Sequence, residues 1–169
     1  MILGLSFENF TLLHVIISLV GILSGIIVLF AMLGGRDVPA LTALFLATTV
    51  LTSVTGFLFP FTTLLPSHIV GIISLVLLAA ALAGLYAFRL GGVWRWVYVV
   101  SAVASLYLNI FVGVVQAFQK LSFLQPLAPT QSEPPFLIAQ VAVLLIFLIL
   151  GFLAVRRFHP HSFTGGYPA

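Results

Sequence analysis

Two of the four histidines of this chain lie near the start of long apolar runs, and they are its residues best suited to chemistry. They are His14 and His68. Two imidazoles at one depth in a membrane could act as axial ligands of a b-type haem, hold a copper or zinc ion, hydrogen-bond a quinone head group, or transfer protons. In the alternative interpretation, each histidine caps its helix at the membrane interface and contacts lipid head groups. The sequence leaves both interpretations open.

A stripe of polar and small residues follows the apolar run between residues 94 and 121. Its members recur at spacings of four and three: Ser101, Ser105, Asn109, Gly113, Gln116 and Lys120. This spacing places them on one face of a helix, with Asn109 near the middle of the membrane. An amide at that depth needs a hydrogen-bond partner, because water is absent. The stripe is therefore either a polar track that receives a ligand or a set of hydrogen bonds between helices.

Five polar residues are predicted to surround a ligand held by the two histidines. Asn109, Gln116 and Gln140 would line the site, because nearly all of the polar residues in the apolar runs are predicted to lie in the outer half of the bundle, as the histidines do. Lys120 and Glu133 would lie at its mouth, beneath a proline-rich loop. The sequence does not identify the ligand or any bound metal.

Several classes of chemistry lack the residues that they need. The chain has no cysteine, which excludes disulfides, thiolate metal sites and cysteine-bound iron–sulfur clusters. No acidic pair lies within an apolar run, which excludes di-metal carboxylate centres. The basic residues are scattered, so the net charge of +3 does not indicate nucleic-acid binding. No catalytic residue is assigned, and the sequence does not decide whether the chain is an enzyme.

Composition places these residues in a membrane. Of the 169 residues, 62% are hydrophobic and 5% are charged, whereas about 25% of residues are charged in a soluble domain. Five apolar runs approach or exceed the roughly 20 residues that span a bilayer. We therefore predict one all-α transmembrane domain, with helices at residues 10–33, 41–59, 67–90, 94–121 and 135–155. An external loop (122–134) and a cytoplasmic tail (156–169) complete it.

The basic residues predict the orientation of the helices. With five spans, one side of the membrane carries five of them: Arg36, Arg89, Arg95, Arg156 and Arg157. The other side carries only Lys120. Because basic loops stay in the cytoplasm, we expect the N-terminus outside and the C-terminus inside.

An internal repeat is a second expectation. Residues 14–25 read HVIISLVGILSG and residues 68–79 read HIVGIISLVLLA, each starting with histidine. Two hairpins repeated in parallel, with one helix added, would bring His14 and His68 together near the external side. Gly21 and Gly25 form a GxxxG pair on the face that carries His14. Such a pair allows close helix contact, so this face is predicted to point into the bundle.

Four stretches of the sequence resemble a known group of proteins. They are LTALFLATTVLTSVTGFLFPF (41–61), LLPSHIVGIISLVLLA (64–79), LNIFVGVVQAFQKL (108–121) and LAPTQSEPPFLIAQ (127–140). They resemble a family of small bacterial multi-pass membrane proteins to which no activity is assigned. The resemblance covers most of the chain and implies a location in the bacterial inner membrane. It implies no substrate, cofactor or partner.

Two functional hypotheses follow from the sequence. The first is a ligand or redox-cofactor site in the outer half of the bundle, with b-type haem, a metal or a quinone as the bound group. The alternative is a non-catalytic accessory or scaffold subunit of a larger membrane complex, whose stripes of small residues bind partner helices. The partners are then the lipid bilayer and either other membrane subunits or further copies of the chain.

Overall fold

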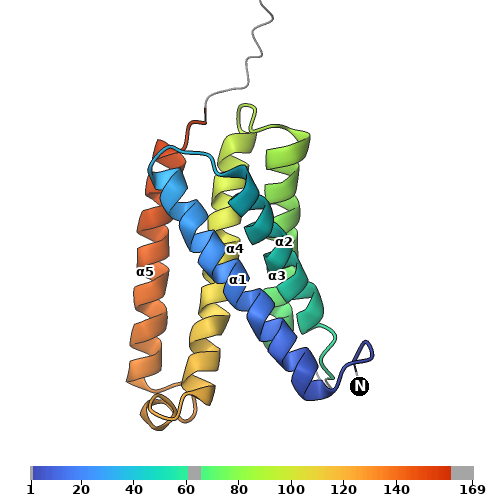
Figure 1. Ribbon diagram of the computed structural model, residues 1–169. Coiled ribbons are helices and arrows are strands. Elements are labelled where there is room, and N and C mark those ends of the chain that lie inside the picture. The colour runs from blue at the N-terminus through green and yellow to red at the C-terminus, as the bar shows by residue number, and fades with distance from the viewer. Residues whose placement is uncertain (1, 61–65, 161–169) are drawn as a thin grey trace, which may run out of the picture.

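The computed structural model describes residues 2–60 and 66–160, and these residues form a bundle of helices (Figure 1). The long helices are α1 (Phe7–Leu33), α2 (Pro39–Gly56), α3 (Pro66–Leu82), α4 (Trp94–Lys120) and α5 (Pro134–Arg157). A π-helix, η1 (Ala83–Ala87), extends α3. All five spans are long and apolar enough to cross a membrane. No strand occurs within the described residues. The predicted all-α bundle of five potential transmembrane helices is thus confirmed, and residues 161–169 of the predicted tail lie outside the described residues.

Local sequence explains where the helices begin and end. The hydroxyl of Ser6 accepts a hydrogen bond from the amide of Asn9 and caps the start of α1. Proline occupies the first turn of α2 and of α5, where its missing N–H costs nothing. Gly35 follows α1 with a φ of +67°, a conformation that glycine adopts without strain.

Two helices end earlier than the sequence predicts. α2 stops at Gly56 rather than residue 59, and Phe57 and Leu58 continue the chain in a turn. α3 loses its α-helical form at Leu82 and continues as η1 only to Ala87. Gly84 allows η1 to pack closely against the start of α4, since a methyl group there would lie 3.0 Å from the carbonyl oxygen of Trp94. Hydropathy does not detect such a change, because the run without charged residues continues from α3 through η1.

The two ends of the bundle differ in charge. The ends of α1, η1 and α5 and the starts of α2 and α4 lie together at the top of Figure 1. All five arginines of the chain belong to this end, which we call the arginine end. The other end, called the loop end, carries Lys120 and the α4–α5 loop (residues 121–133).

The main hydrophobic core lies in the half of the bundle next to the arginine end. Its buried members come from all five helices and the residue after α5: Val28, Leu29, Met32, Phe45, Leu46, Leu78, Ala81, Tyr98, Val99, Ala102, Val103, Leu106, Ala154 and Phe158. A separate small cluster at the loop end joins Phe118, Ala128 and Phe136. The bundle is therefore packed tightly at one end and more loosely at the other.

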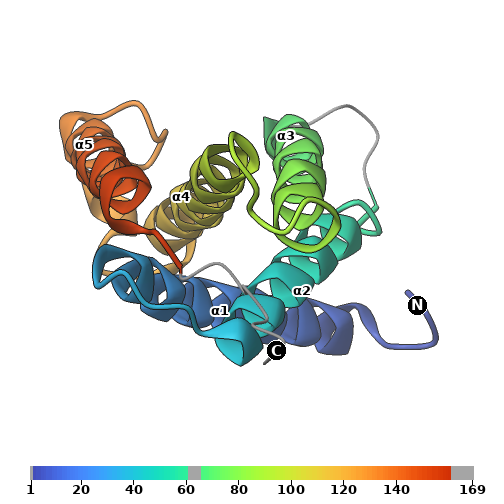
Figure 2. The ribbon, with the colours of Figure 1, turned by 90° about the horizontal axis from the view of Figure 1, so that it is seen from above.

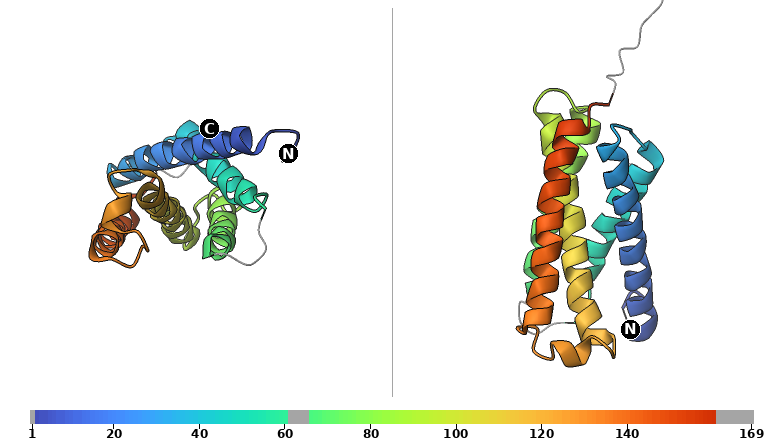
Figure 3. Two further views of the ribbon diagram at one scale, coloured as in Figure 1. Left: turned by 90° about the horizontal axis from the view of Figure 1, so that it is seen from below. Right: turned by 90° about the vertical axis from the view of Figure 1, so that its left-hand side faces the viewer.

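α1 crosses the bundle obliquely (Figures 2 and 3). Near the arginine end it lies beside α5, where a methyl group at Gly35 would lie 3.4 Å from the carbonyl oxygen of Arg157. At the loop end it lies instead beside the segment after α2, with the Phe10 and Phe59 rings 5.1 Å apart. α1 thus diverges from the α4–α5 hairpin towards the loop end.

α4 is the central helix and packs against all four others. It pairs with α3 on one side and α5 on the other, as Figure 2 shows. In the predicted repeat, α2 would correspond to α4, because each is the return helix of its hairpin. α2 does not occupy a central place like that of α4. This arrangement does not support the predicted repeat of two hairpins.

Candidate functional site

His14 points into the bundle, as the GxxxG pattern predicts. Its Nδ1 atom lies 2.7 Å from the hydroxyl oxygen of Thr55 on α2, and its ring packs edge-on against Phe59 at 5.2 Å between centroids. The side chain is half-buried and lies beside Gly56. Within the described residues, its other ring nitrogen, Nε2, makes no hydrogen bond.

His68 lies in the first turn of α3 and is buried. Its ring packs against Phe57 at a centroid distance of 5.6 Å. Gly71 permits this packing, because a methyl group there would lie 3.0 Å from the same phenylalanine. The two histidines therefore contact different phenylalanines of the segment that follows α2.

Asn109 joins α4 to α2 near the middle of the bundle. Its Nδ2 atom donates a hydrogen bond of 3.4 Å to the hydroxyl of Thr49. The hydroxyl of Thr49 itself donates to the carbonyl of Phe45. Gly21 of α1 packs against the Thr49 hydroxyl, since a methyl group there would lie only 3.3 Å from its oxygen. Within the described residues, the amide oxygen of Asn109 accepts no hydrogen bond.

The polar stripe of α4 opens towards the loop end. Ser101 and Ser105 are buried, Asn109 is half-buried, and Gln116 and Lys120 are exposed. The exposure of α4 as a whole follows the same gradient, because residues 107–115 are half-buried without exception. The stripe therefore runs from the packed core to the region where α1 leaves the hairpin.

Gln140 lies on a different side of α4. It is buried, and its Nε2 atom donates a hydrogen bond of 3.2 Å to the carbonyl oxygen of Phe111. Its Oε1 atom is buried and has no hydrogen-bond partner among the residues that the structure describes. On a helix, positions 109 and 111 differ by about 200°, so Gln140 does not reach the site of Asn109.

Glu133 belongs to the α4–α5 loop rather than to a site within the bundle. Its carboxylate accepts hydrogen bonds from the Thr130 hydroxyl at 2.7 Å and from the Thr130 and Ser132 amides at 3.1 Å each. The hydrogen bond from the Thr130 hydroxyl is the largest cause that holds the pKa of Glu133 below its usual value. Glu133 therefore stabilises the turn before α5.

The seven predicted site residues thus fall into separate places. His14 contacts α2, His68 contacts Phe57, and Asn109 contacts Thr49. Gln116 and Lys120 continue the face of Asn109, whereas Gln140 and Glu133 serve the α4–α5 hairpin. The structure thus links Asn109, Gln116 and Lys120 along one open face.

The hydroxyl groups of α2 were not among the predicted site residues. Thr49 and Thr55 provide the partners of Asn109 and His14, and Ser53 donates to Ser74 of α3 at 3.3 Å. Their spacing along residues 48–55 is a helical one, so the sequence did contain this signal. The low hydropathy of α2 came from a hydroxyl face that contacts other helices.

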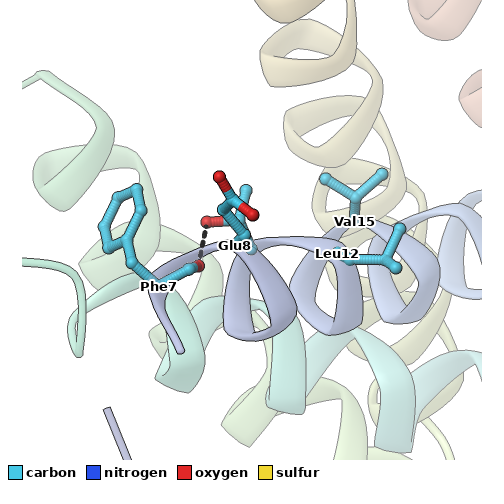
Figure 4. A pocket seen from close by; sticks show the side chains of 5 residues that line it. Phe7, Glu8, Leu12 and Val15 are labelled. Atoms are coloured by element: carbon cyan, nitrogen blue, oxygen red, sulfur yellow. Dashed lines mark hydrogen bonds between the residues drawn. The ribbon is translucent and has the colours of Figure 1, made fainter. Parts of the chain in front are cut away.

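A shallow hollow lies on the loop-end half of α1 (Figure 4). Its lining residues in the described part of the chain are Phe7, Glu8, Thr11, Leu12 and Val15. The wall is almost entirely apolar, and Glu8 is the one charged group in it. This face of α1 is uncovered at the level where α1 leaves the hairpin.

No group of three or more potential metal-ligating side chains occurs within residues 2–60 and 66–160. Comparison of the chain with protein-family models, curated proteins and solved structures finds no match.

Proposed function

We propose that this chain is an integral membrane protein of the bacterial inner membrane that binds a quinone-like ligand beside α4. The ligand class is an amphipathic molecule with an apolar tail and a head group that carries carbonyl or hydroxyl oxygens. The observation that carries the proposal is the position of Asn109. It lies where the packed core ends, and its amide oxygen accepts no hydrogen bond from residues 2–60 and 66–160.

An amide suits both oxidation states of such a head group. Its N–H₂ can donate to a quinone carbonyl, and its oxygen can accept from a quinol hydroxyl. The hydroxyl of Thr49 lies beside it. The apolar side chains of α4 and α1 would contact the tail, and Gln116 and Lys120 would lie nearer the water. The open half of the bundle gives such a ligand access from the lipid.

Haem and metal ions remain proposals with less support. A bis-histidine haem needs both imidazoles on one iron. Here His14 and His68 pack against Phe59 and Phe57 respectively. A structural or catalytic metal site takes at least three protein ligands, and the described residues provide no such group.

The accessory-subunit hypothesis stays a proposal, but Gly21 and Gly25 do not support it. Small residues would have to face outwards to bind partner helices. Instead, a methyl group at Gly25 would lie 2.6 Å from Leu106, and one at Gly21 would lie 3.2 Å from Thr48. These glycines are used within the chain, so any partner or further copy must bind by another surface.

We also propose that the arginine end lies in the cytoplasm, in accordance with the positive-inside rule. Because the chain lacks cysteine, single cysteines can report this orientation. In intact cells, an impermeant maleimide should label Ser132→Cys and not Asp37→Cys. The reverse labelling would overturn the orientation.

Quinone binding is tested directly on the purified protein. Short-chain ubiquinone, equilibrated with protein in detergent micelles, should bind to the wild type. Asn109→Leu should weaken binding roughly three- to tenfold, since one hydrogen bond contributes about 0.5–1.5 kcal/mol. Gln119→Leu is the matched control, because it makes the same kind of change at an exposed position of the same helix. Equal binding by the wild type and Asn109→Leu would refute the site.

The visible spectrum tests the haem alternative. After growth with ample iron, the protein should show no Soret band if its ligand is a quinone. Sharp reduced α and β bands that disappear in both His14→Ala and His68→Ala would instead establish bis-histidine haem.

A further inference from the structure

The α4–α5 loop exposes large apolar side chains at the loop end of the bundle. Phe123 is 69% exposed, Leu127 is 51% exposed and Leu121 is 43% exposed. No charged residue occurs between Lys120 and Glu133. A loop surrounded by water would expose these side chains at a cost in free energy. Their exposure needs a partner that covers them.

These side chains do not project from a loose segment. The chain turns at Leu121–Gln125 and continues as the 3₁₀-helix η2 (Gln125–Leu127). Ala128 is buried between Phe118 and Phe136, whose rings meet edge-on at 5.5 Å. Gln131 donates to the carbonyl oxygen of Val115 on α4. The loop is thus fixed to the hairpin with its apolar side chains outwards.

The backbone of the loop is partly paired within itself. The amides of Leu124 and Gln125 donate to the carbonyl of Leu121, and the amide of Leu127 donates to that of Leu124, each at 2.9 Å. Within the described residues, the amides of Ser122 and Phe123 donate to no backbone carbonyl. Hydrocarbon does not tolerate unpaired backbone groups, so the loop suits the interfacial layer, where head groups and water can accept from these amides.

The position of the loop along the membrane normal agrees with this environment. α4 has 27 residues and is about 40 Å long, which is close to the thickness of a bilayer with its head groups. The loop therefore begins in the head-group layer. Lys120 is the only cation at this end and is exposed at the start of the loop. Its ammonium group can reach lipid phosphates while its stem packs on the apolar side chains.

From these observations we infer that the α4–α5 loop binds the lipid bilayer itself, with Phe123 and Leu127 inserted into the interface and Lys120 against lipid phosphate. The loop is then a membrane anchor that continues the lipid-facing surface of the hairpin. It is not a water-exposed receptor for a soluble partner. The inference shares Lys120 with the proposed quinone site, but its test uses Phe123 and Leu127, which are not part of that site.

The test uses single-cysteine variants labelled with a polarity-sensitive fluorophore in phosphatidylcholine vesicles. Phe123→Cys and Leu127→Cys probe the loop, Asp37→Cys gives a reference in water, and Leu145→Cys gives a reference on the lipid-facing side of α5. The iodide quenching constant at both loop positions should be several-fold smaller than at Asp37→Cys. Spin-labelled lipids should quench both loop labels, as they quench Leu145→Cys.

Two outcomes would overturn the anchor. Iodide quenching equal to that at Asp37→Cys, without quenching by spin-labelled lipid, would place the loop in water. Protection from both quenchers would show that protein covers the loop. Folding of each variant is checked by its far-ultraviolet circular dichroism, and two loop positions are used so that one misfolded variant leaves the test intact.

Discussion

Gly25 should be the position of α1 least able to accept a side chain. A methyl group there would lie 2.6 Å from Cδ1 of Leu106 and 2.8 Å from two ring atoms of Phe45. Carbon atoms in contact are normally about 3.5–4.0 Å apart, so both neighbours would have to move by about 1 Å. Both are buried, with exposed fractions of 1% and 2%. The core around Gly25 therefore has little space into which either can move.

Gly25→Ala changes the free energy of unfolding through two opposing effects, overpacking of the core and the higher helix propensity of alanine. Overpacking of a core costs about 1–3 kcal/mol, whereas alanine is favoured over glycine in a helix by about 0.5–1 kcal/mol. Gly25→Ala should therefore lower the free energy of unfolding by roughly 1–2 kcal/mol. The measurement is unfolding in mixed micelles by increasing SDS, followed by circular dichroism.

Gly113→Ala is the matched control for this prediction. A methyl group at Gly113 would lie 3.7 Å from Cδ1 of Ile22, which is ordinary contact. This variant should be as stable as the wild type or slightly more stable. If Gly25→Ala were as stable as Gly113→Ala, α1 would not approach α2 and α4 as closely as described.

Three further predictions concern single side chains. Arg95→Ala should lower the free energy of unfolding by about 1–2 kcal/mol, because Nη1 of Arg95 donates to two carbonyls at the end of α5, at 2.8 Å each; an equal loss in Arg89→Ala would show that charge alone matters. Gln140→Leu should change stability in the same SDS assay by less than about 1 kcal/mol, since it removes one hydrogen bond together with an unpaired buried oxygen. The pKa of Glu133 is lowered, so its turn should be stable above the usual carboxyl range, near pH 4, and should weaken as the pH falls through the lowered pKa. Amide shifts in NMR spectra would follow this change, and a pH dependence that persisted in Glu133→Gln would contradict it.

The sequence predicts the number and type of elements well because hydrophobicity alone determines them. Five apolar runs correspond to five helices. The GxxxG pair at Gly21 and Gly25 also predicted which face of α1 packs inwards, and His14 on that face contacts α2. Such features depend on local composition and on helical spacing, both of which are visible in one sequence.

The grouping of site residues was much harder to predict. The stripe on α4 was visible, but its partner Thr49 lies 60 positions away. Gln140 and Asn109 have the same chemistry and similar depth, yet they lie on different sides of α4. Which sides face each other depends on the crossing of α1 and on the central place of α4. These follow from the packing of many apolar side chains that hydropathy does not distinguish.

The unequal packing of the two ends has a mechanical consequence. The arginine half is held by the main core, whereas the loop half is held by a few aromatic contacts and one small cluster. A change in the spacing of helices at the loop end therefore disturbs few contacts and costs little free energy. Lateral pressure and thickness differ between membranes. The helices should separate or approach one another at the loop end while the arginine end stays packed, so lipid composition can set the spacing of the helices at the loop end.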